Sequence, residues 1–141
     1  MAITQAMATS FKVQLLNGQQ NFSSNTFKLA LYTSSATINE NTTAYTTSGE
    51  VASTGNYSAG GNTLSVSVTP TNSGNVAYIS FSNTSWANAT ITAAGALIYN
   101  NTQANSAVAI LSFGGDKTST NGTFTVVFPT ADASNAILRI A

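Results

Sequence analysis

The sequence has no histidine and no cysteine, and it has only four basic and four acidic residues among 141. Without histidine and cysteine the chain has no means of forming a Ser-His-Asp triad, a His/Cys zinc site or a disulfide bond. Charged residues make up 6% of the chain, against about 25% in typical soluble domains. Most of the side-chain chemistry that enzymes use is missing, so we predict a protein that is not an enzyme and binds no cofactor or metal ion.

The few charges also balance, and the formal net charge is zero. Without a basic cluster to neutralise phosphates, the chain is not expected to bind nucleic acid. A weakly charged surface produces little repulsion between copies, and proteins near zero net charge tend to associate. We therefore expect a homo-oligomer. Adaptation to a salty medium or compositional drift would explain the same composition.

Long apolar runs are absent too. No run approaches the roughly 20 residues that a membrane-spanning helix needs, and the N-terminal residues lack the basic and apolar regions of a secretory signal. We expect no membrane partner, and a protein that is made in a cytoplasm and is released by lysis. Hydrophobic residues still make up 43% of the chain, which suffices for one packed domain at this length.

Near the start of the chain, apolar residues recur at every fourth position. The repeating residues are Ile3, Met7, Phe11 and Leu15. This spacing predicts one short amphipathic helix within residues 1–18, with Thr4 as its cap and Asn17-Gly18 as its end. A helix of this length is marginal alone, so its apolar stripe is expected to dock on a sheet or on another subunit. We assign the four stripe residues as subunit contacts.

After Gly18 the apolar period changes to two, which is typical of half-buried strands. The strand candidates cover residues 27–32, 64–69, 76–82, 94–99, 107–113, 123–128 and 136–140. Clusters of Asn, Ser, Thr and Gly separate them and supply turns. Short strands at this spacing predict an antiparallel sandwich or barrel. Of the two we expect a β-sandwich, jelly-roll or Ig-like, that forms a single domain over residues 19–141. The residues assigned to its core are Leu29, Leu31, Val66, Phe81, Ile98, Ile110 and Phe128.

Residues 33–62 form the least patterned segment, because few large apolar residues interrupt it. Loops longer than about 12 to 15 residues are usually functional. We predict a long, partly ordered loop here, and two interpretations remain open. In one, the loop is a contact arm that carries Ile38 and Tyr45 to another subunit. In the other, it is a surface loop stabilised by its own side chains.

The few acidic residues give little support for catalysis or metal binding. A glycosidase needs two carboxylates at a defined separation. Glu40 and Glu50 both lie in the long loop, but no pattern positions them as a pair. Asp116 follows two glycines, which indicates a capped turn rather than a calcium site, since calcium requires six to eight oxygen ligands.

Four aromatic residues suggest an alternative binding function. Trp86, together with Tyr57, Tyr78 and Tyr99, could form a platform on which sugar rings stack, with Asn and Thr side chains as hydrogen-bond partners. Aromatic residues in strands more often belong to a core or to an interface between subunits. Both interpretations are open at this point.

Several segments resemble a family of small virion-associated proteins of tailed bacteriophages. The similar segments are TSFKVQLLNG at 9–18, TFKLALYTSSAT at 26–37, TAYTT at 43–47, GEV at 49–51, SAGG at 58–61, AGALIYN at 94–100, FGGDKTS at 113–119 and FPTADA at 128–133. They span essentially the whole chain. They are structural motifs, and none is a catalytic signature.

The resemblance implies a component of the phage particle, without enzymatic residues to transfer to this chain. It does not distinguish the head from the tail. The leading hypothesis is a capsid cement or decoration protein, located in the virion, that forms a homo-oligomer such as a trimer and bridges neighbouring copies of the major capsid protein. The alternative is a tail or fibre module that binds host surface glycans through Trp86 and the neighbouring tyrosines.

Overall fold

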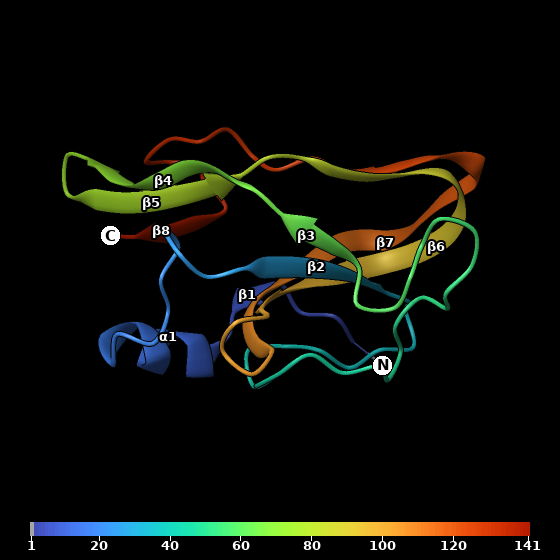
Figure 1. The fold of residues 1–141 in the computed structure, drawn as a ribbon, viewed down its shortest axis with the longest axis horizontal. Coiled ribbons are helices and arrows are strands. Elements are labelled where there is room, and N and C mark those ends of the chain that lie inside the picture. The colour runs from blue at the N-terminus through green and yellow to red at the C-terminus, as the bar shows by residue number, and fades with distance from the viewer. Residues whose placement is uncertain (1) are drawn as a thin grey trace.

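The computed structural model describes residues 2–141 and has mainly β structure (Figure 1). The described residues form β1 (Ala6–Met7), α1 (Thr9–Leu16), β2 (Phe27–Tyr32), β3 (Asn62–Leu64), β4 (Val66–Ser73), β5 (Val76–Phe81), β6 (Thr84–Asn100), β7 (Ser106–Val126) and β8 (Leu138–Ile140). Within these residues, α1 is the sole α-helix, and no helix has the length and apolar character needed to cross a membrane.

The strands form two antiparallel sheets that pack together. One sheet has the strand order β1-β7-β6-β2-β3, and the other has the order β4-β5-β8. The period-two pattern therefore predicted the fold class correctly, as a mainly β protein with packed sheets and one short helix near the N-terminus. The core assignments also hold. Leu29, Leu31, Phe81, Ile98, Ile110 and Phe128 are buried, and Val66 packs against them while partly exposed.

Strands β6 and β7 form one long ribbon, 17 and 21 residues in length, that folds back at one end of the molecule (Figure 1). The turn predicted at Asp116 is wrong, because this residue lies within β7. Ala93 pairs with Lys117 and Gly95 pairs with Ser112, so residues 113–116 form a bulge opposite a single residue. Gly114 and Gly115, with φ of 75° and 145°, supply the backbone conformations that this bulge requires.

The N-terminal helix is shorter than predicted. It begins at Thr9, and Ala8 rather than Thr4 occupies the N-cap position. Met7 belongs to β1, where it pairs with Ala109, and Ile3 forms a bridge with Ile38. A spacing of four residues is also a multiple of the strand period of two, so the apolar pattern fits an extended segment equally well. The predicted end of the helix at residues 17–18 is confirmed.

The segment from residue 33 to residue 61 packs against the larger sheet. Ala36, Ile38, Val51 and Tyr57 are buried within it. Its backbone joins strands through bridges, including one between Tyr32 and Glu50. It is therefore not a partly ordered arm, and the structure agrees with the interpretation of a surface segment stabilised by its own side chains.

A buried amide network holds α1 and the chain that follows it against the turn between β6 and β7. The Gln20 Nε2 donates hydrogen bonds to Gln14 Oε1 at 2.7 Å and to Ser106 Oγ at 3.1 Å. The Asn100 Nδ2 donates to Gln20 Oε1 at 2.8 Å and to Asn25 Oδ1 at 2.9 Å. Buried amides need partners of this kind, so the network fixes the helix at one end of the larger sheet.

Candidate functional site

The six residues predicted to contact other subunits do not form one exposed surface. Phe11 and Ile38 are buried in the core of this chain, which leaves their side chains unavailable to a partner. Ile3, Met7, Leu15 and Tyr45 are partly buried and pack against that core. Three of the six, however, line the same cavity.

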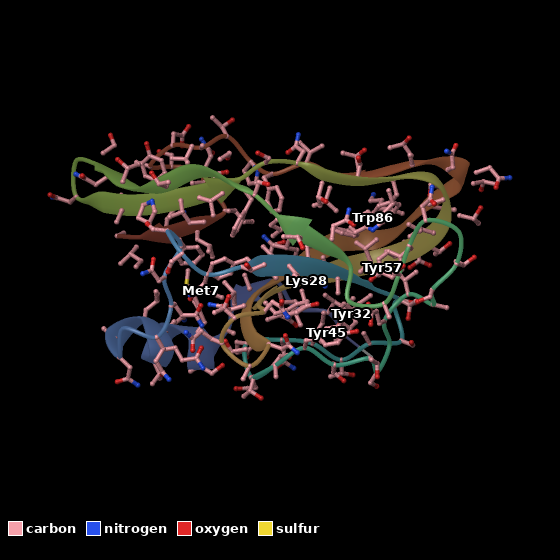
Figure 2. All side chains as sticks on the ribbon, viewed as in Figure 1. Met7, Lys28, Tyr32, Tyr45, Tyr57 and Trp86 are labelled. Atoms are coloured by element: carbon pink, nitrogen blue, oxygen red, sulfur yellow. The ribbon has the colours of Figure 1, made fainter. Side chains whose placement is uncertain are left out.

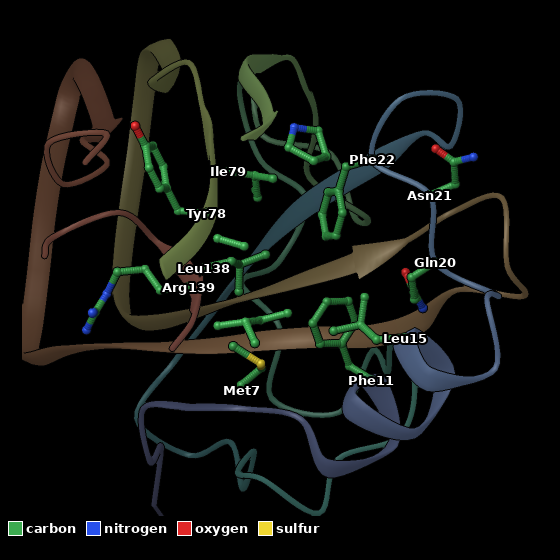
Figure 3. A pocket seen from close by; sticks show the side chains of 13 residues that line it. Met7, Phe11, Leu15, Gln20, Asn21, Phe22, Tyr78, Ile79, Leu138 and Arg139 are labelled. Atoms are coloured by element: carbon green, nitrogen blue, oxygen red, sulfur yellow. The ribbon is translucent and has the colours of Figure 1, made fainter. Parts of the chain in front are cut away.

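This cavity, which we call the helix groove, lies between α1 and the three-stranded sheet and has a volume of about 260 Å³ (Figure 3). Met7, Phe11 and Leu15 lie on one side, and side chains of β5 and β8 lie on the other. The lining is largely apolar, and its full set is Met7, Phe11, Leu15, Gln20, Asn21, Phe22, Pro70, Ala77, Tyr78, Ile79, Leu138, Arg139 and Ile140.

Phe22 lies at one end of the helix groove and contacts aromatic rings on both of its sides. Its ring stacks on Phe27 with centroids 4.5 Å apart, meets Phe11 edge-on at 6.0 Å and lies 6.2 Å from Phe81. Aromatic pairs at such distances favour defined offset and edge-on orientations. Phe11 of α1 therefore packs on the core through Phe22, and these aromatic contacts fix the position of the helix beside the groove.

Three large apolar side chains of this region are exposed. Leu16 is 90% exposed and Val13 is 53% exposed, both on α1, and Ile140 of β8, which lines the helix groove, is 57% exposed. The single charged residue of α1 is Lys12. Apolar side chains that gather on a surface mark sites of interaction more often than scattered ones do.

The residues that the sequence analysis assigned as subunit contacts lie on the inner side of the helix. The stripe at residues 7, 11 and 15 faces its own chain, whereas Val13 and Leu16 face outward. The sequence contained a signal for an apolar outer side. The outer side of a helix on a monomer is usually polar, whereas Val13 and Leu16 are apolar. Ile79, Leu138 and Ile140 join the groove through sheet pairing, which the local sequence pattern does not reveal.

A second cluster surrounds Glu50 and connects parts of the segment 33–61. Figure 2 labels three tyrosines near this cluster, Tyr32, Tyr45 and Tyr57. The Glu50 carboxylate accepts hydrogen bonds from the Tyr45 hydroxyl at 2.5 Å, from the Tyr57 hydroxyl at 2.8 Å and from the Gly60 N–H at 2.6 Å. The Tyr57 hydroxyl also accepts a hydrogen bond from the Leu31 N–H at 2.9 Å. Glu50 thereby connects three points of the segment with strand β2.

The tyrosines of this cluster stay protonated at neutral pH. Burial raises the pKa of Tyr32, Tyr45 and Tyr57 far above the ordinary value, and the nearby charge of Glu50 adds to the effect. The same two causes raise the pKa of Tyr99 to about 12. These hydroxyls can therefore donate hydrogen bonds but supply no phenolate near neutrality. The arrangement is that of a structural clamp.

The other acidic residues do not join Glu50 in a site. Glu40 and Asp116 are exposed. In the part of the chain that the structure describes, no three acidic side chains come together in a way that could hold a metal ion.

The aromatic platform proposed for sugar binding is not an exposed surface. Trp86, Tyr57 and Tyr99 are buried, and Tyr78 lines the helix groove instead. Trp86 packs against Tyr57 with ring centroids 5.5 Å apart, and Tyr99 stacks on Tyr45 at 4.8 Å. The structure thus supports the interpretation of Trp86, Tyr57 and Tyr99 as core aromatics.

The fold and the helix groove together define a small antiparallel β-sandwich-like protein with a largely apolar groove between α1 and the smaller sheet. Comparisons with protein-family models, with curated proteins and with solved structures find no match for the chain.

Proposed function

We propose that this protein is a non-enzymatic structural component of a tailed-bacteriophage particle and acts as a capsid cement or decoration protein. The observation that carries the proposal is the pair of exposed apolar side chains Leu16 and Val13 on the outer side of α1, on a chain with very few charges. The resemblance of several sequence segments to virion-associated phage proteins supplies the setting. The protein bridges neighbouring copies of the major capsid protein and associates with copies of itself.

The mechanism is mechanical. Burying one exposed Leu or Val side chain contributes roughly 1.5 to 3 kcal/mol, so a single contact through α1 is weak. Repeated over a lattice, weak contacts add up through multivalency. Because the protein binds the assembled lattice and not the dispersed subunits, binding stabilises the assembled state by mass action.

Counting copies in purified particles tests the proposal. Quantitative mass spectrometry should find on the order of hundreds of copies per particle, as expected for repeated lattice contacts. A count of about a dozen or fewer, typical of a symmetric ring or fibre, would contradict a cement function and favour the tail or fibre alternative.

Reconstitution tests the contact surface. Particles that lack the protein should release their contents at a lower temperature, and added purified protein should restore the stability. Leu16→Asp should fail to restore it, because a charge would have to be buried without a partner. The matched control is Asn88→Asp, which adds the same charge at an exposed site outside the helix groove, where φ is 50° and Asp is tolerated. Equal restoration by both variants would exclude α1 as the contact.

A further inference from the structure

A second and more polar groove, of about 420 Å³, lies along the folded β7 strand and the residue that follows it. We call it the β7 groove. Its lining comes from residues 113–127 alone and includes the rings of Phe113 and Phe124, several hydroxyl groups and Lys117. It shares no lining residue with the helix groove.

Of the two rings, that of Phe113 is the more exposed, and it packs against the core. Its ring centroid lies 6.2 Å from that of Phe124, which in turn meets the ring of Trp86 at 6.4 Å. Phe124 and Trp86 are buried. Phe113 therefore presents a held apolar surface at the groove, and a ring of this kind packs well against the C–H face of a flat, hydroxylated molecule.

Of the polar groups of the β7 groove, Thr118 and Ser119 are hydrogen-bonded to strand β6, and Thr123, Thr125 and Lys117 are free to bind a ligand. Thr123 and Thr125 are exposed, and neither hydroxyl has a hydrogen-bond partner among residues 2–141. A threonine hydroxyl can both donate and accept. Lys117 is exposed and, within the same described residues, forms no ion pair. Asp116, next to it in the chain, does not line the groove.

We propose that the β7 groove binds an acidic saccharide, that is, a sugar ring that carries a carboxylate. The ring packs on Phe113, its hydroxyl groups exchange hydrogen bonds with Thr123 and Thr125, and its carboxylate pairs with Lys117. A sugar matches the alternation of apolar surface and hydroxyl groups, and the unpaired ammonium selects the acidic form, because hydrogen bonds between charged groups are the stronger ones. This site is independent of the proposed cement function.

The test uses two probes that differ only at one carbon, methyl glucuronide and methyl glucoside, titrated into the isotope-labelled protein and followed by NMR. The glucuronide should shift the amide signals of Phe113, Lys117, Thr123 and Thr125 and should bind about tenfold more tightly than the glucoside. Shifts that are absent with both probes, or that lie outside residues 113–127, would overturn the proposal.

Two substitutions separate the contributions of charge and hydroxyl groups. Lys117→Gln should weaken glucuronide binding about tenfold and leave glucoside binding unchanged, and Thr123→Val should weaken binding of both sugars. The control is Lys12→Gln, which removes the same charge from exposed α1. If Lys117→Gln binds the glucuronide as tightly as Lys12→Gln does, the pairing of a carboxylate with Lys117 is wrong.

Discussion

The segment 33–61 and helix α1 both cover the larger sheet, but they are held in different ways. The segment has few large apolar residues, and the Glu50 cluster anchors its polar groups by hydrogen bonds from Tyr45, Tyr57 and Gly60. Helix α1 has no side-chain cap and one charged residue, and it is anchored by Phe11 on its inner side. Its outer side leaves Leu16 and Val13 exposed.

This difference teaches where a contact surface is to be sought. A segment whose polar groups are satisfied within the chain and whose apolar groups are buried has little to offer a partner. A helix with apolar groups on both sides can satisfy only one side within its own chain. Of the two segments predicted to make subunit contacts, the long segment is thus part of the fold, and α1 remains a contact candidate through its other side.

The largest expected effect separates the two sides of α1. Phe11→Ala should lower the free energy of unfolding by about 3 to 5 kcal/mol, because it creates a cavity among Phe22 and its neighbours. Leu16→Ala, on the exposed side, should change it by less than about 0.5 kcal/mol. Urea denaturation of both variants at several protein concentrations measures this. If Leu16→Ala is strongly destabilising and the effect grows with concentration, Leu16 is already buried between copies in solution.

A somewhat smaller effect is expected at the polar anchor of the segment 33–61. Glu50→Ala leaves two tyrosine hydroxyls and the Gly60 N–H without their acceptor, and should lower the free energy of unfolding by about 2 to 3 kcal/mol. Glu40→Ala removes an exposed carboxylate of the same segment and serves as the control. Hydrogen exchange should show faster exchange at residues 45–60 in the Glu50 variant alone. Equal effects of the two substitutions would mean that apolar burial, not Glu50, anchors the segment.

The parts of the fold that follow from local pattern were predictable. The alternation of apolar and polar residues predicted the bounds of β2 and β5 to within one residue. It does so because successive side chains of a strand point to opposite faces of the sheet. The pattern at Ile3 and Met7 misled because strand and helix share a spacing of four. The glycines at 114–115 indicated a turn, but the continued pairing of β6 with β7 made them a bulge.

The candidate sites were less predictable, because they depend on contacts between distant segments. From the sequence, Met7, Phe11 and Leu15 of the helix groove were named as contacts and Tyr78 as part of an aromatic platform, whereas Ile79 and Leu138 reach the groove through the pairing of β5 with β8. The role of Glu50 was missed for a similar reason. Its partners are close in sequence, but the cluster forms only where β2 and β6 bring Tyr32 and Tyr99 beside it.

The smallest expected effect is a loss of stability at alkaline pH that begins in the segment 33–61. The pKa of Tyr99 is raised to about 12 in the folded protein, mainly by burial, whereas an unfolded tyrosine titrates near 10. The neutral hydroxyl is thus favoured by folding. Its contribution is fully present below pH 10 and is lost as the pH rises from about 10 to about 12. For Tyr99 alone we expect a loss on the order of 1 to 2 kcal/mol by pH 11.5, because one unit of pKa difference corresponds to about 1.4 kcal/mol.

Urea denaturation between pH 8 and 11.5, with the tyrosinate absorbance followed in parallel, measures this dependence. Tyr99→Phe should flatten the decline in the free energy of unfolding above pH 10, since the variant has one fewer proton to release on unfolding. Hydrogen exchange at the alkaline end should increase first at residues 45–60, where Tyr45 and Tyr57 contact Glu50, and later in α1, which contains no tyrosine. If α1 exchanges first, the helix is held less firmly than the segment 33–61 at alkaline pH, and the expected order of opening is wrong.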